Sequence, residues 1–268
     1  MTTFSDTYHD YFLVEETDLY QHYHNPKMPF LYSCNVLKFK RNPTLEEYIS
    51  TEKKLKNFQQ KIKQDFIYLY AVENEPFSEE IEQYLLSENY TIDAEELLII
   101  DPKDFYFKQS NAEAAVVLVQ RDNQLKEYLD FMYRLNLKHG VSFAQKKQAF
   151  YLERFHSPKI QLVNAYLNGQ VVGAANLILS STFIEIDHFE VEQSFQHRGI
   201  GTEIQKFIMS QAKDKKVILI ADKQSESNSM YYHQHYQLGG YQTSAFKRFE
   251  PSYLPALPQP YPSIASTP

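Results

Sequence analysis

The second half of the chain alternates between strand-like and helix-like patterns of hydrophobic positions. Short runs rich in β-branched and aromatic residues predict strands, and apolar residues spaced three and four apart predict amphipathic helices. Asn168-Gly169 joins two of the strands and is a strong hairpin signal. The predicted strands cover residues 114–120, 160–167, 171–179, 183–191, 217–221 and 241–249, and the predicted helices cover 122–140, 143–155, 200–213 and 227–238.

The first half predicts a smaller α/β module. Strands are expected at residues 30–40, 65–72 and 95–100. One helix is expected after the capping box Thr44-Leu-Glu-Glu47, and another at residues 79–86. The segment Tyr84 to Tyr90 is similar to the segment Tyr236 to Tyr241, so the first half resembles the C-terminal part of the second. An unrelated α/β extension is the alternative. The tail, residues 251–268, is rich in proline and is expected to be extended.

Composition and charge narrow the class of protein. The 268 residues are 43% hydrophobic but contain no apolar run of membrane-spanning length and no secretory signal, so we expect a cytoplasmic protein without a membrane partner. Cys34 is the single cysteine, which excludes an internal disulfide and a thiolate zinc site. The net charge of −7 argues against a nucleic-acid partner.

Glycine is distributed unevenly along the chain. All seven glycines lie from Gly140 onward, so we expect the chemistry in the second half. Gly199 and Gly201 follow the strand that ends at Val191 and open a helix. Such a turn presents free amide N–H groups at the positive end of a helix, which favours a pyrophosphate ligand.

The spacing Gln196-x-x-Gly199-x-Gly201 after this strand resembles the acetyl-CoA signature of the GCN5-related N-acetyltransferase (GNAT) superfamily. The element order β-α-α-β-β-β-α-β-α-β over residues 112–250 is also that of the family. The resemblance implies an α/β (α+β) fold with a mixed, mostly antiparallel sheet flanked by helices. It implies an N-terminal module at residues 1–110, a catalytic domain at 111–250 and the tail. One interpretation of the N-terminal module is a degenerate GNAT-like copy without a cofactor site.

The resemblance further implies acetyl-CoA as cosubstrate, with its pyrophosphate on the glycine turn. The backbone of the preceding strand would pair with pantetheine, and an asparagine on the last helix would contact it; Asn228 lies one position from the family's place, where this chain has Ser229. The residues implied to bind acetyl-CoA are Phe189, Val191, Gln196, His197, Arg198, Gly199, Ile200, Gly201, Thr202 and Asn228.

The resemblance also implies the catalytic residues. Tyr236, on the last predicted helix, matches the tyrosine that protonates the departing thiolate, and Tyr231 and Tyr232 are alternatives. Glu185 and Asp187 are candidates for the base that deprotonates the amine. Strict alternation places both on one strand face with Phe189 and Val191, while Glu190 faces the other way. Glu185 matches the position of the base in histone-type members.

No metal site is expected, because the His-x-His pairs at residues 22–24 and 233–235 lack further ligands at metal spacing. The leading hypothesis is an N-acetyltransferase that acts on a primary amine of a small molecule or peptide. A non-catalytic module that binds or senses acyl-CoA is the alternative, and an interaction protein with an inactive glycine turn is a third. The sequence leaves the acceptor and the oligomeric state open.

Overall fold

The computed structural model describes residues 2–249, so the proline-rich tail lies outside the described residues. The chain forms two compact units that interleave along the sequence. Residues 2–10, 73–76 and 93–243 form unit 1, and residues 11–72, 77–92 and 244–249 form unit 2. The sequence predicts contiguous domains that meet near residue 110, whereas each unit takes segments from both ends of the chain.

Unit 1 contains an open sheet with helices on both faces. Its strands follow the order β11-β5-β10-β9-β8-β7-β6, and β9 and β10 run parallel while β5/β10, β6/β7, β7/β8 and β8/β9 are antiparallel. This confirms the predicted mixed, mostly antiparallel sheet. The elements are β5 (Thr91–Ile100), β6 (Ala115–Leu118), α3 (Asp122–Asn136), α4 (Val141–Phe155), β7 (Ile160–Leu167), β8 (Gln170–Leu179), β9 (Phe183–Val191), α5 (Ile200–Ala212), β10 (Lys216–Asp222), α6 (Glu226–His233) and β11 (Gln237–Arg248).

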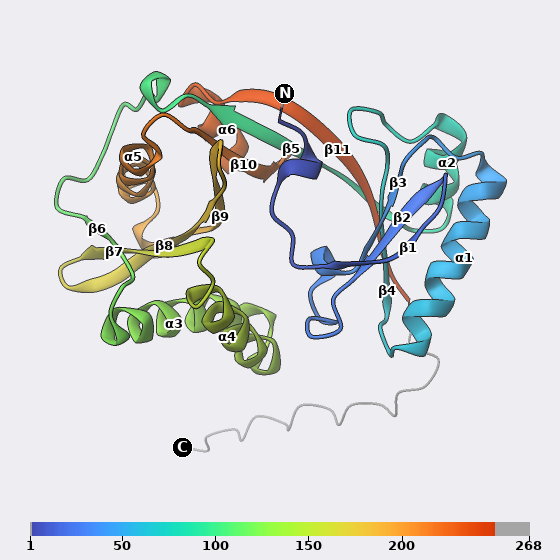
Figure 1. Ribbon diagram of the computed structural model, residues 1–268, viewed down its shortest axis with the longest axis horizontal. Coiled ribbons are helices and arrows are strands. Elements are labelled where there is room, and N and C mark those ends of the chain that lie inside the picture. Colours follow the sequence, from blue (N-terminus) through green and yellow to red (C-terminus); the bar gives the residue numbers. More distant parts are fainter. Residues whose placement is uncertain (1, 250–268) are drawn as a thin grey trace, which may run out of the picture. The chain divides into compact units, whose positions relative to one another are not determined.

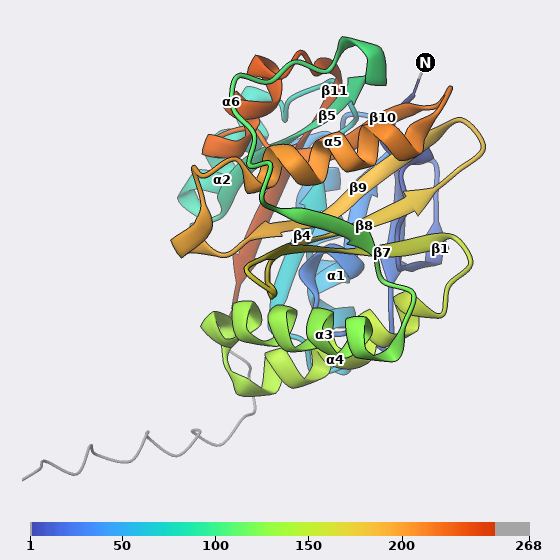
Figure 2. The same cartoon turned by 90° about the vertical axis from the view of Figure 1, so that its left-hand side faces the viewer.

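The helices of unit 1 divide between the two faces of this sheet. Helices α3 and α4 pack on β7 and β8 from one face, and α5 packs on β8 and β9 from the other (Figures 1 and 2). Ile204 and Ile208 of α5 are fully buried against Ile184 and Ile186 of β9, as their helical spacing predicts. The α5 face of the sheet therefore carries one hydrophobic core of unit 1, and α3 and α4 bury further apolar side chains on the other face.

Unit 2 is built mainly from the first half of the chain. Its strand order is β1-β2-β3-β4-β11, and β3 and β4 are parallel. The hairpin of β1 and β2 was not among the predicted elements, and the strand predicted at residues 30–40 is shorter because a 3₁₀ turn occupies Tyr32–Cys34. The elements are β1 (Phe12–Glu16), β2 (Tyr20–His24), β3 (Val36–Phe39), α1 (Leu45–Lys61), β4 (Phe66–Tyr70) and α2 (Glu79–Ser87).

The chain repeats one supersecondary pattern. The run β3-α1-β4-α2-β5 has the same order as β9-α5-β10-α6-β11, and in each run the first two strands pair in parallel. The last strand of each run is divided between the two units. Residues 93–100 of β5, the last strand of the first run, belong to unit 1, and residues 244–248 of β11, the last strand of the second run, belong to unit 2. The order agrees with the predicted likeness of the two halves. Within residues 2–249, no helix combines the length and the hydropathy that crossing a membrane requires.

Candidate functional site

Strands β9 and β10 pair at one end and are unpaired at the other. Their parallel register runs from Phe183–Lys216 to Ile186–Leu219, although β9 continues to Val191 and β10 to Asp222. We call this opening, residues 187–191 of β9 and 220–222 of β10, the β9–β10 fork. Backbone groups of β9 that face the fork have no partner strand on that side, so they can bind an extended ligand.

A β-bulge at His188 marks the beginning of the fork. Between the pairs Ala174–Glu190 and Asn176–Asp187, β9 has one more residue than β8, and His188 adopts the left-handed conformation with φ of 48°. A non-glycine residue in this region carries backbone strain, and such bulges are common beside active sites.

The bulge changes which residues of β9 share a face. Phe189 and Val191 pack against the same core as Ile184 and Ile186, on the α5 side of the sheet. Glu190 therefore lies on the opposite face, and the predicted grouping of Glu185 and Asp187 with Phe189 and Val191 is wrong. Strict alternation fails because one extra residue reverses the side-chain direction. The α3–α4 face of β9 thus carries Glu185, Asp187 and Glu190.

The predicted glycine turn lies between β9 and α5. Gly199 adopts the left-handed conformation with φ of 78° and forms the N-cap of α5, and no side chain caps this helix. The exposed residues Gln196, His197 and Arg198 precede it, and Gln196 Nε2 donates a hydrogen bond to the Val191 carbonyl at 3.0 Å. A 13-residue helix with an uncapped start has amides available for an anion.

The remaining turn residues begin the helix itself. Ile200 is buried in the core of unit 1, and Gly201 and Thr202 are half-buried in the first turn of α5. A Cβ atom added at Gly201 would lie 3.4 Å from the Phe189 ring and 3.8 Å from Val191, so this glycine lets α5 approach the fork strand. The structure therefore brings the turn residues together with Phe189 and Val191.

Residues 105–111, which we call the strap, lie against the glycine turn. A Cβ atom added at Gly199 would lie 2.7 Å from the Ser110 carbonyl carbon and 2.8 Å from the Asn111 nitrogen. Farther along α5, the Lys206 ammonium lies over the Phe107 ring at 5.1 Å. Glycine is thus required at residue 199 both by its positive φ and by the close approach of the strap.

The last helix is shorter than predicted, and this changes the place of Tyr236. Helix α6 ends at His233, and His235 adopts the left-handed conformation with φ of 74° that terminates it. Tyr236 follows, outside the helix, with a side chain only 2% exposed. Its hydroxyl donates to Gln205 Oε1 at 3.1 Å. The strand β11 begins at Gln237, so the last residues of the helix predicted at 227–238 lie outside α6.

The equivalent end of α2 has the same construction. After α2, Asn89 adopts the left-handed conformation with φ of 60°, and the buried Tyr90 follows it. Tyr90 N donates to the Leu85 carbonyl as Tyr236 N donates to the Tyr231 carbonyl. Tyr90 therefore corresponds to Tyr236, not to Tyr241 as its sequence context suggests. In both copies this tyrosine anchors the chain after a helix.

Tyr231, five residues before Tyr236, lies on α6 itself. Its ring is buried edge-on against Tyr236 at 5.3 Å, and burial raises the pKa of its hydroxyl, with the charge of Glu190 adding to the shift. Within residues 2–249 this hydroxyl makes no hydrogen bond. Tyr232, by contrast, donates its hydroxyl to Glu96 at 2.7 Å.

Asn228 lies near the start of α6 and is 4% exposed. Its Nδ2 donates to Glu96 Oε2 at 2.9 Å and to the Lys223 carbonyl at 3.1 Å, while its Oδ1 is buried without a partner in the described part of the chain. The Asn228 NH₂ group is thus already bonded to Glu96 and Lys223, and only the side-chain carbonyl oxygen is available to a ligand.

Glu185, the first predicted base, is buried on the α3–α4 face of β9. Its side chain is 5% exposed, and its Oε2 accepts a hydrogen bond from the Tyr8 backbone N–H at 2.7 Å. Burial raises the pKa of Glu185 to about 7, a shift that the Tyr8 N–H opposes and the neighbouring Asp187 increases. A carboxyl group with a pKa near neutrality can accept and release a proton at physiological pH.

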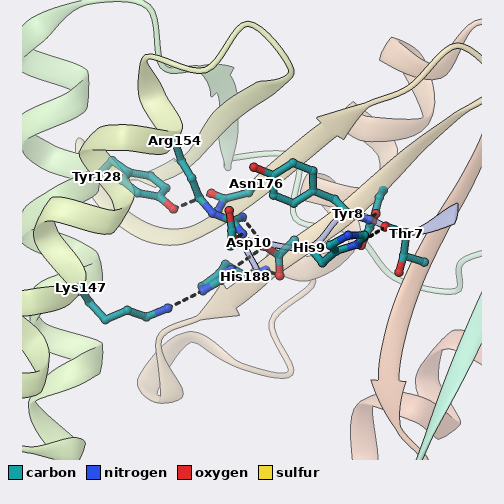
Figure 3. A network of polar contacts seen from close by, with 11 residues as sticks. Thr7, Tyr8, His9, Asp10, Tyr128, Lys147, Arg154, Asn176 and His188 are labelled. Carbon is teal, nitrogen blue, oxygen red and sulfur yellow. Dashed lines mark hydrogen bonds and ion pairs between the residues drawn. The ribbon is translucent and has the colours of Figure 1, made fainter. Parts of the chain in front are cut away.

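Asp187, the second predicted base, is held by cations. Arg154 of α4, 6% exposed, bonds Asp187 through Nη1 and Asp10 through Nη2, the latter at 2.5 Å (Figure 3). Burial opposes ionisation of Asp187, but its contacts with His188 and Arg154 hold its pKa well below the usual range. Asp187 therefore remains a carboxylate, and its role is better described as charge pairing than as proton acceptance.

His188 connects Asp187 to Lys147 of α4. Its Nδ1 lies 2.8 Å from Asp187 Oδ2, and its Nε2 lies 2.8 Å from Lys147 Nζ (Figure 3). The Lys147 ammonium also lies over the rings of Phe150 at 4.2 Å and Tyr151 at 5.1 Å. A continuous polar chain thus extends from α4 to the bulge.

The sequence interpretation did not include Asp10, Lys147 or Arg154. A usable signal existed for two of them: Lys147, Phe150, Tyr151 and Arg154 recur at helical spacing, so two cations lie on the apolar face of α4. Buried cations on such a face need a partner. Asp10 gives no comparable signal because its partner is 144 residues away. Among residues 2–249, no group of three or more His, Cys, Asp or Glu side chains could hold a metal ion.

Comparison with known families agrees with this geometry. Residues 123–236 match the profile described as Acetyltransferase (GNAT) family, and this stretch includes the fork, the glycine turn and α6. Residues 123–236 form a GNAT domain. Residues 2–98 match a separate profile, a domain of unknown function named DUF5613. A GNAT domain supports an acetyltransferase-type function, and the family uses acetyl-CoA as cosubstrate.

Solved structures show the same fold over most of the chain. A functionally unknown conserved protein from Staphylococcus epidermidis is 27% identical, with a TM-score of 0.83 over 92% of this chain and 98% of its own. A GCN5-related N-acetyltransferase from Sphaerobacter thermophilus is 9% identical, with a TM-score of 0.59 over 88% of this chain and 82% of its own. A tandem GNAT protein from the clavulanic acid biosynthesis pathway is 8% identical, with a TM-score of 0.51 over 80% of this chain and 75% of its own. No curated protein matches the chain.

Proposed function

We propose that the protein transfers an acetyl group from acetyl-CoA to a primary amine of a small molecule or peptide. The observation that carries the proposal is the β9–β10 fork directly before the uncapped N-terminus of α5. The fork provides unpaired backbone for an extended amide chain, and the helix provides N–H groups for a diphosphate. One strand and one turn thus offer the two kinds of contact that this cosubstrate needs.

The residues present fit acetyl-CoA. The backbone from His197 to Thr202 would hold the pyrophosphate, and the exposed Arg198 guanidinium adds a positive charge there. The backbone of Phe189 and Val191 would hold the pantetheine amides. The buried Oδ1 of Asn228, which lacks a partner in the described residues, could accept one further hydrogen bond. When bound, acetyl-CoA supplies an acetyl group activated as a thioester.

Glu185 is the residue best suited to deprotonate the incoming ammonium. Its pKa of about 7 lets a substantial fraction be ionised at neutral pH, and protonation then costs little. The Tyr8 N–H fixes one carboxyl oxygen, which leaves the other to receive the proton directly or through water. Asp187, paired with Arg154, contributes negative charge that favours a cationic acceptor on this face.

Tyr231 is the residue best suited to protonate the departing sulfur. It is a helix residue near the fork strand, and its hydroxyl is not committed to another group in the described chain, whereas the Tyr236 hydroxyl is bonded to Gln205. Burial raises the pKa of both phenols, so both remain protonated at neutral pH. Tyr236, the predicted acid, is the alternative donor.

The test measures cosubstrate binding and turnover separately. Calorimetry with acetyl-CoA should give saturable binding, and thiol release should depend on an added amine from a panel of primary amines. Arg198→Glu should weaken acetyl-CoA binding, while Lys126→Glu, the same charge change on the exposed side of α3, should not. Binding without amine-dependent thiol release would instead favour the acyl-CoA-binding alternative, and no binding would contradict the proposal.

A further inference from the structure

Lys147 occupies a site shaped for a primary ammonium group. Its side chain is 6% exposed, its Nζ lies over the faces of the Phe150 and Tyr151 rings, and His188 Nε2 lies 2.8 Å from it. Aromatic faces attract a cation through their quadrupole, and an imidazole nitrogen adds a directional hydrogen bond. The same surroundings would bind the ammonium group of an acceptor substrate.

The hydrogen bonds define the tautomer of His188. An ammonium group only donates, so His188 Nε2 must accept from Lys147. Nδ1 then carries the ring proton and donates it to Asp187 Oδ2 at 2.8 Å. Burial lowers the pKa of His188, which favours the neutral ring that accepts from Lys147. The imidazole lone pair is therefore directed at a proton of the Lys147 ammonium.

This arrangement has the form of an activated nucleophile. In enzymes that use covalent catalysis, the nucleophile lies within hydrogen-bond reach of a base, and a third group orients the base. Here the amine is Lys147, the base is His188 and the orienting carboxylate is Asp187. Arg154 and Asp10 extend the chain and hold the Asp187 carboxylate in place (Figure 3).

The polar chain reaches β9, the strand whose backbone would bind pantetheine under the proposed function. His188 is the bulge residue at which β9 leaves β10, and its ring packs against Phe150 and Tyr151 of α4. The strained backbone at His188, with φ of 48°, is what directs this side chain toward α4 rather than along the normal strand alternation. Lys147 Nζ is thus within hydrogen-bond distance of the side chain of a residue whose backbone belongs to the β9–β10 fork.

We propose that Lys147 is an acceptor in its own chain, so that the GNAT domain acetylates Lys147 Nζ; the inference rests on the proposed function. Lys147 passes one proton to His188 Nε2, and the freed lone pair forms a C–N bond with the thioester carbonyl carbon. The C–S bond breaks, and the sulfur takes the second proton of the amine. The products are Nζ-acetyl-lysine, the thiol of CoA and one proton released from His188 to solvent.

Acetylation of Lys147 would change the site. The amide has no positive charge, so the cation over Phe150 and Tyr151 is lost, and the acetyl group enlarges a side chain that is already buried. The modification is therefore expected to lower the rate of acetyl transfer to added amines.

The experiment incubates the full chain with acetyl-CoA and follows acetylation of each lysine by peptide mass spectrometry. Lys147 should be acetylated faster than the exposed Lys126, although Lys126 is far more accessible. Acetic anhydride, a reagent that needs no binding site, should give the reverse order. Excess CoA should suppress acetylation at Lys147 and leave the anhydride reaction unchanged.

His188→Asn is the matched variant for the base. Asparagine tolerates the left-handed backbone and can still contact Asp187, but it is too short to reach Lys147. The acetylation rate at Lys147 should fall ~10²–10⁴-fold, with unchanged acetyl-CoA affinity by calorimetry. An unchanged rate in His188→Asn, or no preference for Lys147 over Lys126, overturns the inference. If acetyl-CoA binds and an added amine is acetylated while Lys147 is not, the proposed function stands and the inference about Lys147 fails. If acetyl-CoA does not bind, the proposed function and the inference both fail.

Discussion

Tyr231 and Tyr236 are expected to respond in opposite ways to removal of the hydroxyl group. The two rings are in edge-to-face contact at 5.3 Å, and both are buried. Tyrosine to phenylalanine retains the ring and its packing in each case, so the two variants differ in what the lost hydroxyl contacts. Tyr236 donates to Gln205, whereas the Tyr231 hydroxyl has no hydrogen bond within residues 2–249.

The structure sets the magnitude of each effect. Tyr236→Phe leaves the buried Gln205 Oε1 without its donor, which costs about 1–3 kcal/mol of unfolding free energy. Gln205 Nε2 still donates to Gln234 Oε1 at 2.8 Å, so the rest of the contact is retained. Tyr231→Phe leaves no partner unsatisfied, and its stability should change by less than about 0.5 kcal/mol. If Tyr231 protonates the sulfur, its removal lowers turnover by ~10²–10⁴-fold.

Urea unfolding and steady-state thiol release on the two purified variants test both halves of this argument. Tyr236→Phe should be less stable with near-normal turnover, and Tyr231→Phe should be as stable as the wild type with strongly reduced turnover. Acetyl-CoA affinity should be unchanged in both variants, because the proposed binding site for the pyrophosphate is the turn at Gly199. A large turnover loss in Tyr236→Phe with wild-type turnover in Tyr231→Phe would refute this reasoning and restore the acid predicted from the sequence.

Three further changes probe the site and its counterpart in unit 2. The pKa of Glu185 is raised from its ordinary 4.5 to about 7, so folding favours the neutral carboxyl group. The unfolding free energy of the wild type should therefore be highest below about pH 4.5 and decline by on the order of 3 kcal/mol as the pH rises through 7. Glu185→Gln should remove this decline, which urea titrations at several pH values can measure. Gly199→Ala should lower the unfolding free energy by more than about 1 kcal/mol, because residue 199 has a positive φ and its Cβ atom would lie 2.7 Å from Ser110. Gly201→Ala should be neutral or slightly stabilising, because the nearest atom to its Cβ would lie 3.4 Å away. Equal stability of the two variants would contradict the strap contact. Thr44→Ala should cost about 1 kcal/mol through loss of the α1 cap and leave acetyl-CoA affinity unchanged, which calorimetry can check.

The sequence predicted most elements of unit 1 because their signals are local. Asn168 and Gly169 both have positive φ in the hairpin between β7 and β8, and that conformation is what their side chains allow. The capping box at Thr44 and Glu47 is likewise present as expected. The missed hairpin of β1 and β2 has a weaker signal, since β1 is exposed along its whole length and shows no buried alternation.

The errors at the site come from single-residue shifts that a sequence pattern does not reveal. The bulge at His188 reverses the facing of Glu190, although the residues around it fit regular alternation. The helix end at His235 was missed because the left-handed position is occupied by histidine instead of glycine, the residue that usually marks a helix end. Long-range pairs such as Asp10 with Arg154 depend on tertiary structure alone.

The two repeated runs differ most clearly at the start of their first helices. In α1, Thr44 Oγ1 accepts a hydrogen bond from the Glu47 N–H at 3.2 Å, and the Glu47 carboxylate accepts one from the Thr44 N–H at 2.9 Å. The hydrogen bond from Arg41 lowers the pKa of Glu47 to about 2, so this carboxylate stays ionised. In α5, Gly199 leaves the corresponding amides without a side-chain cap. A cap and a phosphate group compete for the same N–H groups, so a helix start optimised for stability cannot also bind a diphosphate. Of these two helix starts, only that of α5 therefore has the free N–H groups that the proposed acetyl-CoA site requires, whereas the cap of α1 contributes about 1 kcal/mol of helix stability.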